Sequence, residues 1–246
     1  MRIFLIAIFL VFLYNCSSQK IIRAAMADDK GLTANQKKAK YLIIVKQYGD
    51  TAWERLDYNF SGPMITRSTF LDSNLTVLHG KYAEYRSTGY LSSDGQYYKN
   101  RKDGRWLVYD DTSLAVLEYK YHLDTLLSVT DLDSLSKEKK KLKEDTTGQV
   151  EARYIGGINN ISKIIQSNLK VPDRLAALTK GGTDRIRFVI DTTGKPVDAE
   201  VLRSVEFTFD EESKRVILLL KDWVPASDKG VKLKAYRIQP ITVVLE

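Results

Sequence analysis

The sequence predicts an α+β protein, with an antiparallel sheet of repeated hairpins before a two-layer unit that has helices on one face of a three-stranded sheet. Three observations predict this fold. An internal repeat lies in the first half, a highly charged segment follows it, and the last part combines hairpin, helix and strand patterns. The 246 residues are enough for one or two globular domains with a sizeable core.

The first sixteen residues have the pattern of a secretion signal. Arg2 precedes an unbroken apolar run at residues 3–13, which is too short to span a bilayer but typical of a signal-peptide core. Leu13 lies three residues before Cys16, the only cysteine of the chain. This spacing resembles a bacterial lipobox, although Asn15 departs from the small residue that such motifs prefer. The resemblance implies lipidation of Cys16 and firm anchoring through several acyl chains.

Two alternatives remain for this segment: ordinary secretion with cleavage near residues 25–27, and a buried structural Cys16. A single cysteine excludes an intramolecular disulfide. No Asp follows Cys16, which in bacterial lipoproteins implies an outer-membrane anchor, and residues 17–20 lack the acidic cluster associated with export to the cell surface. We therefore expect a lipid-anchored protein of the cell envelope that faces the periplasm. Residues 17–36 are polar with scattered Ala, and we interpret them as a tether.

Residues 37–128 are interpreted as a β-rich repeat domain. The motif His79-Gly80-Lys81-Tyr82-x-x-Tyr85 returns with an offset of 24 residues as Asp103-Gly104-Arg105-Trp106-x-x-Tyr109. We expect hairpin turns at residues 94–95 and 102–104. The pattern at residues 53–127 resembles the MORN-related repeat of the YwqK antitoxin-like family, in which each unit is a β-hairpin stacked on its neighbours. The strands at residues 53–58 and 64–71 would supply a degenerate third copy.

The aromatic residues of the repeat allow two interpretations. Tyr82, Tyr85, Trp106 and Tyr109 either pack across neighbouring strands or form a ligand-binding face. Exposure of the four side chains would favour the binding face, and burial would count against it. Residues 129–151 then become charged and lose their aromatic residues. We interpret them as a linker whose Lys run at 139–141 is a solvated face.

The C-terminal unit begins with an amphipathic helix that carries Ile at 158, 161, 164 and 165 and is ended by Pro172. Residues 185–191 alternate apolar and polar side chains, and the turn signal at 191–194 leads into a second alternating strand. Thr208-x-x-Glu211 has the pattern of a capping box before a helix whose apolar stripe runs through Val216, Leu219, Leu220 and Trp223. A long strand at residues 232–245 completes the unit.

This unit resembles the C-terminal domain of the TonB energy-transducer family, in the divergent form common in the Bacteroidetes. The matching pieces are, in order, Gly156-Gly157, Val171-Pro172, Phe188-Val189-Ile190-Asp191, Gly194-Lys195, Val201-Leu202-Arg203-Ser204, Asp210-Glu211-Glu212, Trp223-x-Pro225 and Pro240-Ile241. Their order and spacing carry the resemblance, which covers residues 152–246.

The resemblance implies a binding mode. Domains of this family add an extended peptide from an outer-membrane receptor to a sheet edge, where backbone hydrogen bonds supply affinity and alternate side chains supply selectivity. The expected edge is the last strand, with candidate partner-binding residues Lys234, Tyr236, Ile238, Pro240 and Ile241. Pro240 cannot donate to a ladder, which favours an edge. An unpaired last strand would also permit a homodimer.

The chain departs from a working transducer of that family. Energy transduction there needs an inner-membrane helix and usually a Pro-rich periplasmic span, whereas this chain has five prolines and a lipid-anchor motif. We therefore expect a TonB-like binding protein associated with TonB-dependent transport. The alternatives are a scaffold that binds a protein, glycan or membrane surface through its repeat sheet, and an antitoxin-like protein, the latter by analogy alone.

The composition argues against other classes. The net charge of +7 is spread thinly, and no Lys/Arg block with interleaved aromatic residues indicates nucleic-acid binding. The two histidines, His79 and His122, lie in the repeat, and no His, Cys or carboxylate spacing indicates a metal site or a cofactor. Asp210, Glu211 and Glu212 are expected to cap a helix rather than to catalyse. We therefore do not expect an enzyme.

Overall fold

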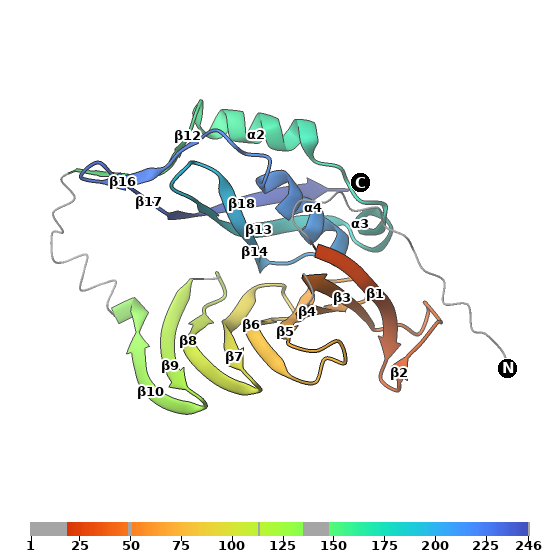
Figure 1. The fold of residues 1–246 in the computed structure, drawn as a ribbon. Coiled ribbons are helices and arrows are strands. Elements are labelled where there is room, and N and C mark those ends of the chain that lie inside the picture. Colours follow the sequence, from red (N-terminus) through yellow and green to blue (C-terminus); the bar gives the residue numbers. More distant parts are fainter. Residues whose placement is uncertain (1–18, 49–50, 113, 135–147, 246) are drawn as a thin grey trace.

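The computed structural model describes residues 19–48, 51–112, 114–134 and 148–245. These residues form a ten-stranded antiparallel sheet, followed by a C-terminal unit at residues 148–245 (Figure 1). An architecture of mostly antiparallel sheet with a few helices is compatible with the predicted α+β class. The signal segment with Cys16 and the Lys run at 139–141 lie outside the described residues.

In the large sheet, strands that follow one another along the chain are paired from β3 to β10, and β1 pairs with β3 on its other side. The strands are β1 (Gln19–Asp28), β2 (Gly31–Leu32), β3 (Tyr41–Tyr48), β4 (Ala52–Asn59), β5 (Met64–Phe70), β6 (Leu78–Tyr85), β7 (Leu91–Tyr98), β8 (Arg101–Tyr109), β9 (Ala115–His122) and β10 (Thr125–Asp131). Residues 53–58 and 64–71, predicted as strands, lie almost entirely in β4 and β5.

The offset of 24 residues has a structural counterpart in the hairpin turns. Lys99 and Asn100 connect β7 to β8 with φ of 47° and 66°, and Leu123 and Asp124 connect β9 to β10 with φ of 47° and 70°. Positive φ at both central residues is the conformation of a type I′ turn, whose twist matches that of the flanking strands. The repeat read in the sequence is therefore also a repeat of backbone geometry.

The predicted turns at residues 94–95 and 102–104 are wrong, because these residues lie inside β7 and β8. Gly95 is explained by a close approach rather than by a turn. A Cβ atom at this position would lie 2.2 Å from the indole of Trp106, which packs directly on the glycine. Glycine inside a strand often marks such an approach.

The predicted tether at residues 17–36 is also wrong for most of its length. Residues 19–28 form β1, which pairs with β3 from Gln19 opposite Tyr48 to Ala27 opposite Tyr41. Most side chains of β1 are exposed or only partly buried, so the strand has little apolar alternation to reveal it. Its backbone pairing with β3 depends on a neighbour that sequence periodicity does not report.

The C-terminal unit contains a sheet of three strands in the order β14-β13-β18. Its elements are β11 (Gln149–Val150), β12 (Arg153–Tyr154), α2 (Gly157–Asn168), α3 (Asp173–Leu178), β13 (Gly181–Ile190), β14 (Pro196–Arg203), α4 (Phe207–Ile217), β15 (Trp223–Val224), β16 (Ala226–Asp228), β17 (Val231–Leu233) and β18 (Ala235–Val244). The predicted hairpin is confirmed as β13 and β14. Asp191 holds the turn by accepting hydrogen bonds from the backbone N–H of Thr193 and Lys195, at 2.8 and 3.0 Å.

The predicted capping box of α4 is wrong. The helix begins after Glu206, whose side chain accepts a hydrogen bond from the Phe209 N–H at 3.0 Å, so Thr208 lies inside the first turn. The helix also ends at Ile217, and Trp223 belongs to the short strand β15. The predicted last strand is divided in two, since Lys234 separates β17 from β18.

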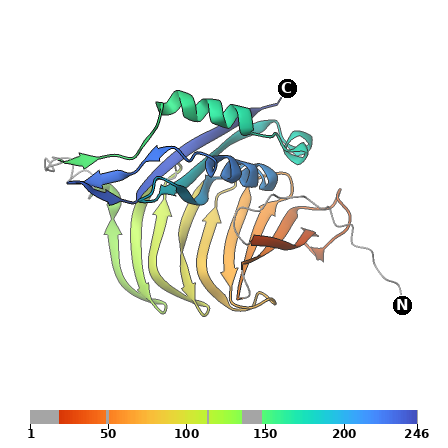
Figure 2. The ribbon, with the colours of Figure 1, turned by 45° about the horizontal axis from the view of Figure 1, so that its top comes forward.

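The two sheets share a hydrophobic core. The C-terminal unit lies across one end of the ten-stranded sheet, over the hairpins that connect β4 to β5, β6 to β7 and β8 to β9 (Figures 1 and 2). Buried side chains from both parts form a single cluster, which includes Tyr58, Tyr85 and Leu91 from the large sheet and Phe188 and Phe209 from the C-terminal unit. Among the described residues, no helix is long and apolar enough to cross a membrane.

Candidate functional site

β18 is an edge strand of the three-stranded sheet. It pairs with β13 over ten residues in continuous register, from Ala235 opposite Ile190 to Val244 opposite Gly181. No other described strand pairs with its second side. The predicted sheet edge is therefore present in the structure, along a strand of ten residues.

The direction of the backbone groups of β18 follows from Pro240. In an antiparallel strand, the N–H and C=O of one residue point to one side and those of the next residue to the other. Pro240 has no N–H to donate to β13, and its carbonyl accepts a hydrogen bond from the Gln239 side chain at 3.0 Å. The Tyr236 carbonyl is likewise bonded by the Arg237 side chain, at 3.3 Å. Even-numbered residues of β18, Ile238 among them, therefore point their backbone groups to the free edge.

The candidate partner-binding residues differ in position. Tyr236 and Ile238 are 70% and 42% exposed, and Pro240 is also exposed. The three side chains lie on the face of the sheet that carries Arg187 of β13. Lys234 is exposed just before the strand. Ile241 is only 1% exposed, since it points to the opposite face and packs in the shared core. Its inclusion among the surface residues is wrong, because side chains of a strand alternate between faces.

The four repeat aromatics also divide between two faces. Within each motif the aromatic positions are three residues apart, so their side chains point to opposite sides of the sheet. Tyr85 and Tyr109, 9% and 3% exposed, face the C-terminal unit, where the Tyr85 hydroxyl donates to the Val201 carbonyl at 2.8 Å. Trp106 is 5% exposed on the other face, and Tyr82 there is partly exposed.

On that second face the aromatic side chains form a row across four strands. Tyr82 contacts Tyr97 at 5.2 Å between ring centroids, Tyr97 contacts Trp106 at 5.2 Å, and Trp106 contacts Tyr121 at 6.4 Å. The three contacts are edge-to-face, the favourable arrangement for aromatic pairs. Lys102 lies over Trp106, with its ammonium 4.3 Å from the ring centroid. Cross-strand packing explains these residues, as the simpler of the two interpretations expects.

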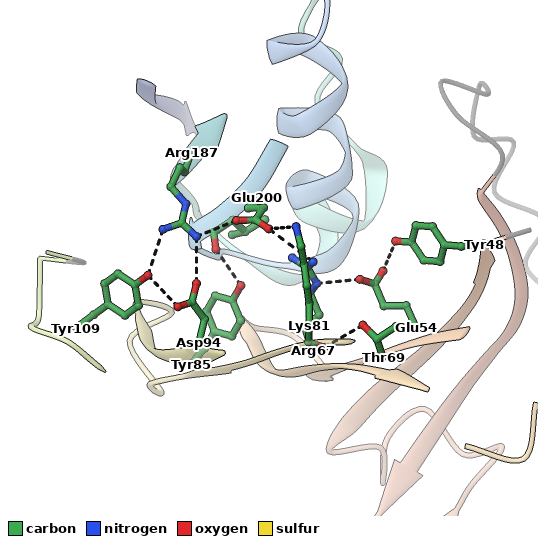
Figure 3. A network of polar contacts seen from close by, with 11 residues as sticks. Tyr48, Glu54, Arg67, Thr69, Lys81, Tyr85, Asp94, Tyr109, Arg187 and Glu200 are labelled. Atoms are coloured by element: carbon green, nitrogen blue, oxygen red, sulfur yellow. Dashed lines mark hydrogen bonds and ion pairs between the residues drawn. The ribbon is translucent and has the colours of Figure 1, made fainter. Parts of the chain in front are cut away.

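An ion-pair network joins the large sheet to the C-terminal unit (Figure 3). Glu200 of β14 is bonded by Lys81 of β6 at 2.6 Å and by Arg187 of β13 at 2.8 Å. Arg187 also reaches Asp94 of β7 at 3.0 Å. Arg67 of β5 continues the network by bonding Glu54 at 2.8 Å. We call Glu54, Arg67, Lys81, Asp94, Arg187 and Glu200 the ion-pair network.

The network is electrically balanced, with three acids and three bases. Burial alone would raise the pKa of Glu200, but the cations around it, Arg67 and Lys81 foremost, lower the pKa to about 2. A cavity of about 320 Å³ adjoins the network. Because the cations are already paired within the network, this cavity gives no sign of an anion site.

A second group of polar residues lies deeper in the contact between the large sheet and the C-terminal unit, which we call the joint. The carboxylate of Asp210 in α4 accepts hydrogen bonds from the Tyr58 hydroxyl at 2.8 Å and the Ser204 hydroxyl at 2.7 Å. Asp184 of β13 accepts from Ser213 at 2.7 Å, and both carboxylates accept from the Val205 N–H. We call Tyr58, Asp184, Ser204, Asp210 and Ser213 the carboxyl cluster.

Asp184 and Asp210 are both completely buried. Burial raises the pKa of Asp210 to about 7, although its hydrogen bonds from Ser204 and Tyr58 oppose the shift. Burial and the charge of Asp210 also raise the pKa of Asp184 well above its usual range. Two adjacent buried carboxyls cannot both ionise readily, so the pair retains a proton near neutral pH.

Sequence reasoning missed the role of the acidic run at 210–212. Only Asp210 is buried, and Glu211 instead pairs at 2.6 Å with Lys46 of β3, which is 2% exposed. Glu212 pairs with Arg215 on the helix surface, at 2.7 Å. Helical spacing indicates that three adjacent residues point in different directions, but Tyr58 and Lys46, the partners of Asp210 and Glu211, lie in strands 152 and 165 residues away in the sequence.

In the described residues, no group of three or more His, Cys, Asp or Glu side chains is placed to hold a metal ion. Comparison with protein families matches residues 167–242 to the family described as Gram-negative bacterial TonB protein C-terminal. This result confirms the family resemblance found in the sequence, and it implies a cell-envelope protein with a TonB-like interaction domain. No curated protein and no solved structure matches the chain.

Proposed function

We propose that the protein is a lipid-anchored envelope protein that binds an extended segment of an envelope partner by strand addition to β18. The proposed partner is an outer-membrane receptor of TonB-dependent transport, and the protein acts by binding rather than by catalysis. The observation that carries the proposal is the unpaired second side of β18 inside a TonB-like domain. An added strand would bond the outward N–H and C=O groups of Tyr236, Ile238 and Thr242.

The joint between the sheets supports a scaffold role for the repeat sheet. It contacts the C-terminal unit through a common core and through hydrogen bonds between backbones, such as that from the Ser204 N–H to the Gly89 carbonyl at 2.9 Å. A Cβ atom on Gly89 would lie 2.1 Å from the Ser204 carbonyl oxygen, so glycine allows this approach. The repeat sheet would therefore hold β18 in a fixed orientation relative to the anchor.

The shared core also decides how the proposal is tested. Deletion of the C-terminal unit would expose buried side chains of the large sheet, including Tyr58 and Tyr85, and would not leave an intact repeat sheet. A single substitution at the edge tests the proposal more directly than this deletion. Ile238→Pro removes one outward N–H and leaves the ladder to β13 intact, because proline is tolerated where the N–H side faces solvent.

The experiment is a pull-down from crosslinked cell envelopes with the full chain, Ile238→Pro and the control Ile238→Val. We expect the wild type and the Val variant to capture outer-membrane receptors and the Pro variant to lose them. Equal capture by a folded Pro variant, checked by its thermal unfolding, would exclude the edge as the binding surface. Metabolic labelling with a fatty acid, absent in Cys16→Ser, tests the proposed anchor.

A second candidate function uses the aromatic row of the large sheet. The observation that favours it is the partial exposure of Tyr82, Tyr97 and Tyr121 on the face away from the C-terminal unit. The burial of Tyr85, Trp106 and Tyr109 argues against it. Capture of partners that survives Ile238→Pro but is lost in Tyr97→Ala would assign binding to this face.

A further inference from the structure

A cavity lies beside the free edge of β18, on the side of the helices. Its volume is about 270 Å³, and its lining includes Tyr154, Ile158, Ile161, Trp223, Arg237 and Ile238. These residues come from β12, α2, β15 and β18. The cavity is distinct from the one at the ion-pair network, which lies on the opposite side of the sheet and includes Tyr236.

The lining is mainly apolar. Trp223 makes edge-to-face contacts with Tyr154 at 5.2 Å and with Phe188 at 5.7 Å between ring centroids, so three aromatic rings pack together there. The sequence predicts Ile158 as one of the apolar residues of an amphipathic helix, and in α2 its side chain is 66% exposed. An exposed Ile on the border of an aromatic cavity is a surface that a partner can cover.

The cavity is in line with the edge. Ile238 points its N–H and C=O outward, whereas the side chains of Arg237 and Gln239 lie on the helix side of the strand, opposite Phe188 and Ile186 of β13. A strand added along β18 would place every second side chain on that same side. One of these side chains would lie in the cavity next to Arg237 and Gln239.

The charges near the cavity are mostly positive. Arg153 lines it, and Lys232 and Lys234 are exposed on the approach to β18; none of the three forms an ion pair with a described residue. Arg237 pairs with Glu151 at 3.0 Å, and Glu151 is 91% exposed. The surface along the first half of β18 therefore favours an acidic partner.

We infer that this cavity is the specificity pocket for the strand added to β18, and that it takes an apolar or aromatic side chain of an acidic, extended peptide. The inference rests on the proposed strand addition and names the partner that such binding would select. An apolar anchor in a desolvated pocket contributes most of the affinity, and the neighbouring cations raise the association rate for an acidic chain.

The test begins with a phage-displayed library of random linear peptides, selected on the full chain purified in detergent. We expect enriched peptides to be acidic and to carry one apolar or aromatic residue at a fixed position. A synthetic peptide of the enriched sequence is then titrated by fluorescence anisotropy against the wild type, Ile158→Glu, Ile155→Glu and Ile238→Pro. Ile155 is the matched control, because it is 56% exposed but does not line the cavity.

We expect the Kd to increase at least about tenfold in Ile158→Glu and to stay at the wild-type value in Ile155→Glu. For the wild type, the Kd should also rise with salt concentration. Loss of binding in Ile238→Pro together with unchanged binding in Ile158→Glu would overturn the pocket while leaving strand addition in place. Unchanged binding in both variants would overturn both. Enriched peptides without an acidic consensus that carries one apolar or aromatic residue would also contradict the inference. A homodimer of the wild type that dissociates in Ile158→Glu would contradict it as well.

Discussion

The large sheet contacts the C-terminal unit through two polar groups that differ in burial and in charge. The carboxyl cluster is completely buried at Asp184 and Asp210 and retains a proton. The ion-pair network is partly open to solvent, with Asp94, Arg187 and Glu200 between 19% and 24% exposed, and each of its acids is paired with a base. Both groups connect the same two sheets, so they can be compared within one joint.

The difference has a simple physical cause. A buried carboxyl group keeps its proton when the loss of hydration outweighs nearby cations, as it outweighs Lys214 for Asp210, whereas a carboxylate paired with several cations stays ionised. Replacing a buried ion pair with apolar residues is often neutral, so pairs of this kind define geometry more than they add stability. We infer that the carboxyl cluster contributes more to the stability of the joint, and that the ion-pair network determines its register.

The largest effect of a single substitution is expected for Asp210→Ala, which removes the acceptor of the Tyr58 and Ser204 hydroxyls. Buried donors left without an acceptor should lower the free energy of unfolding by about 3 kcal/mol. Urea unfolding well below pH 7 measures the change, because the contribution of the cluster is lost as pH rises through about 7. Asp210→Asn, which keeps one oxygen acceptor, should lose less. A change in Asp210→Ala below about 1 kcal/mol would show that the cluster does not hold the joint.

The next effect is on pH dependence. The pKa of Asp184 and of Asp210 is raised on folding, so their contribution is fully present below the unfolded pKa of 3.8 and is lost as pH rises through the folded pKa, about 7 for Asp210. Stability should therefore fall between pH 4 and 7 by roughly 1.4 kcal/mol per pH unit for each extra proton bound. Asp184→Asn imitates the protonated acid and should flatten this slope, measured as Tm against pH. An unchanged slope would contradict the shared proton.

At low pH the stability should depend on pH in the opposite direction. Glu200 and Glu211 have their pKa lowered to about 2, so their contribution is present above the unfolded pKa of 4.5 and is lost as pH falls towards 2. Arg187→Met removes the ion pairs to Glu200 and Asp94 and should lower the free energy of unfolding by about 1–2 kcal/mol at neutral pH. A double-mutant cycle with Asp94→Asn measures the coupling of the pair, and a coupling near zero would remove Arg187 from the network.

The smallest effect provides a reference for the others. Arg101 and Asp124 form an ion pair at 3.4 Å with both side chains more than half exposed. Arg101→Ala should change the free energy of unfolding by at most about 0.5 kcal/mol, since solvent screens such pairs. Urea unfolding of this variant beside Arg187→Met distinguishes a surface pair from a pair in the joint. Equal losses would remove that distinction.

Much of the local structure could be predicted from the sequence. The alternation at 185–191 with its Asp-Thr-Thr-Gly turn is the hairpin of β13 and β14, and the 24-residue offset returns as repeated type I′ turns. These features depend on residues close in sequence. The wrong predictions share a cause, which is a contact with a residue distant in sequence. Gly95 has the pattern of a turn residue, but it is required because Trp106 packs on it. Residues 19–28 have the composition of a tether, but they form a strand because they pair with β3.

The sequence by itself therefore determined the elements whose side-chain period is local, the family of the C-terminal domain and the strand most suited to form an edge. Only the tertiary structure decided which groups the joint brings together: Asp184 beside Asp210, Lys46 beside Glu211, and Ile158 beside the free edge at Ile238. The physical reason is that periodicity reports which face of an element is apolar, whereas a buried charge or a cavity depends on what a distant segment places against that face.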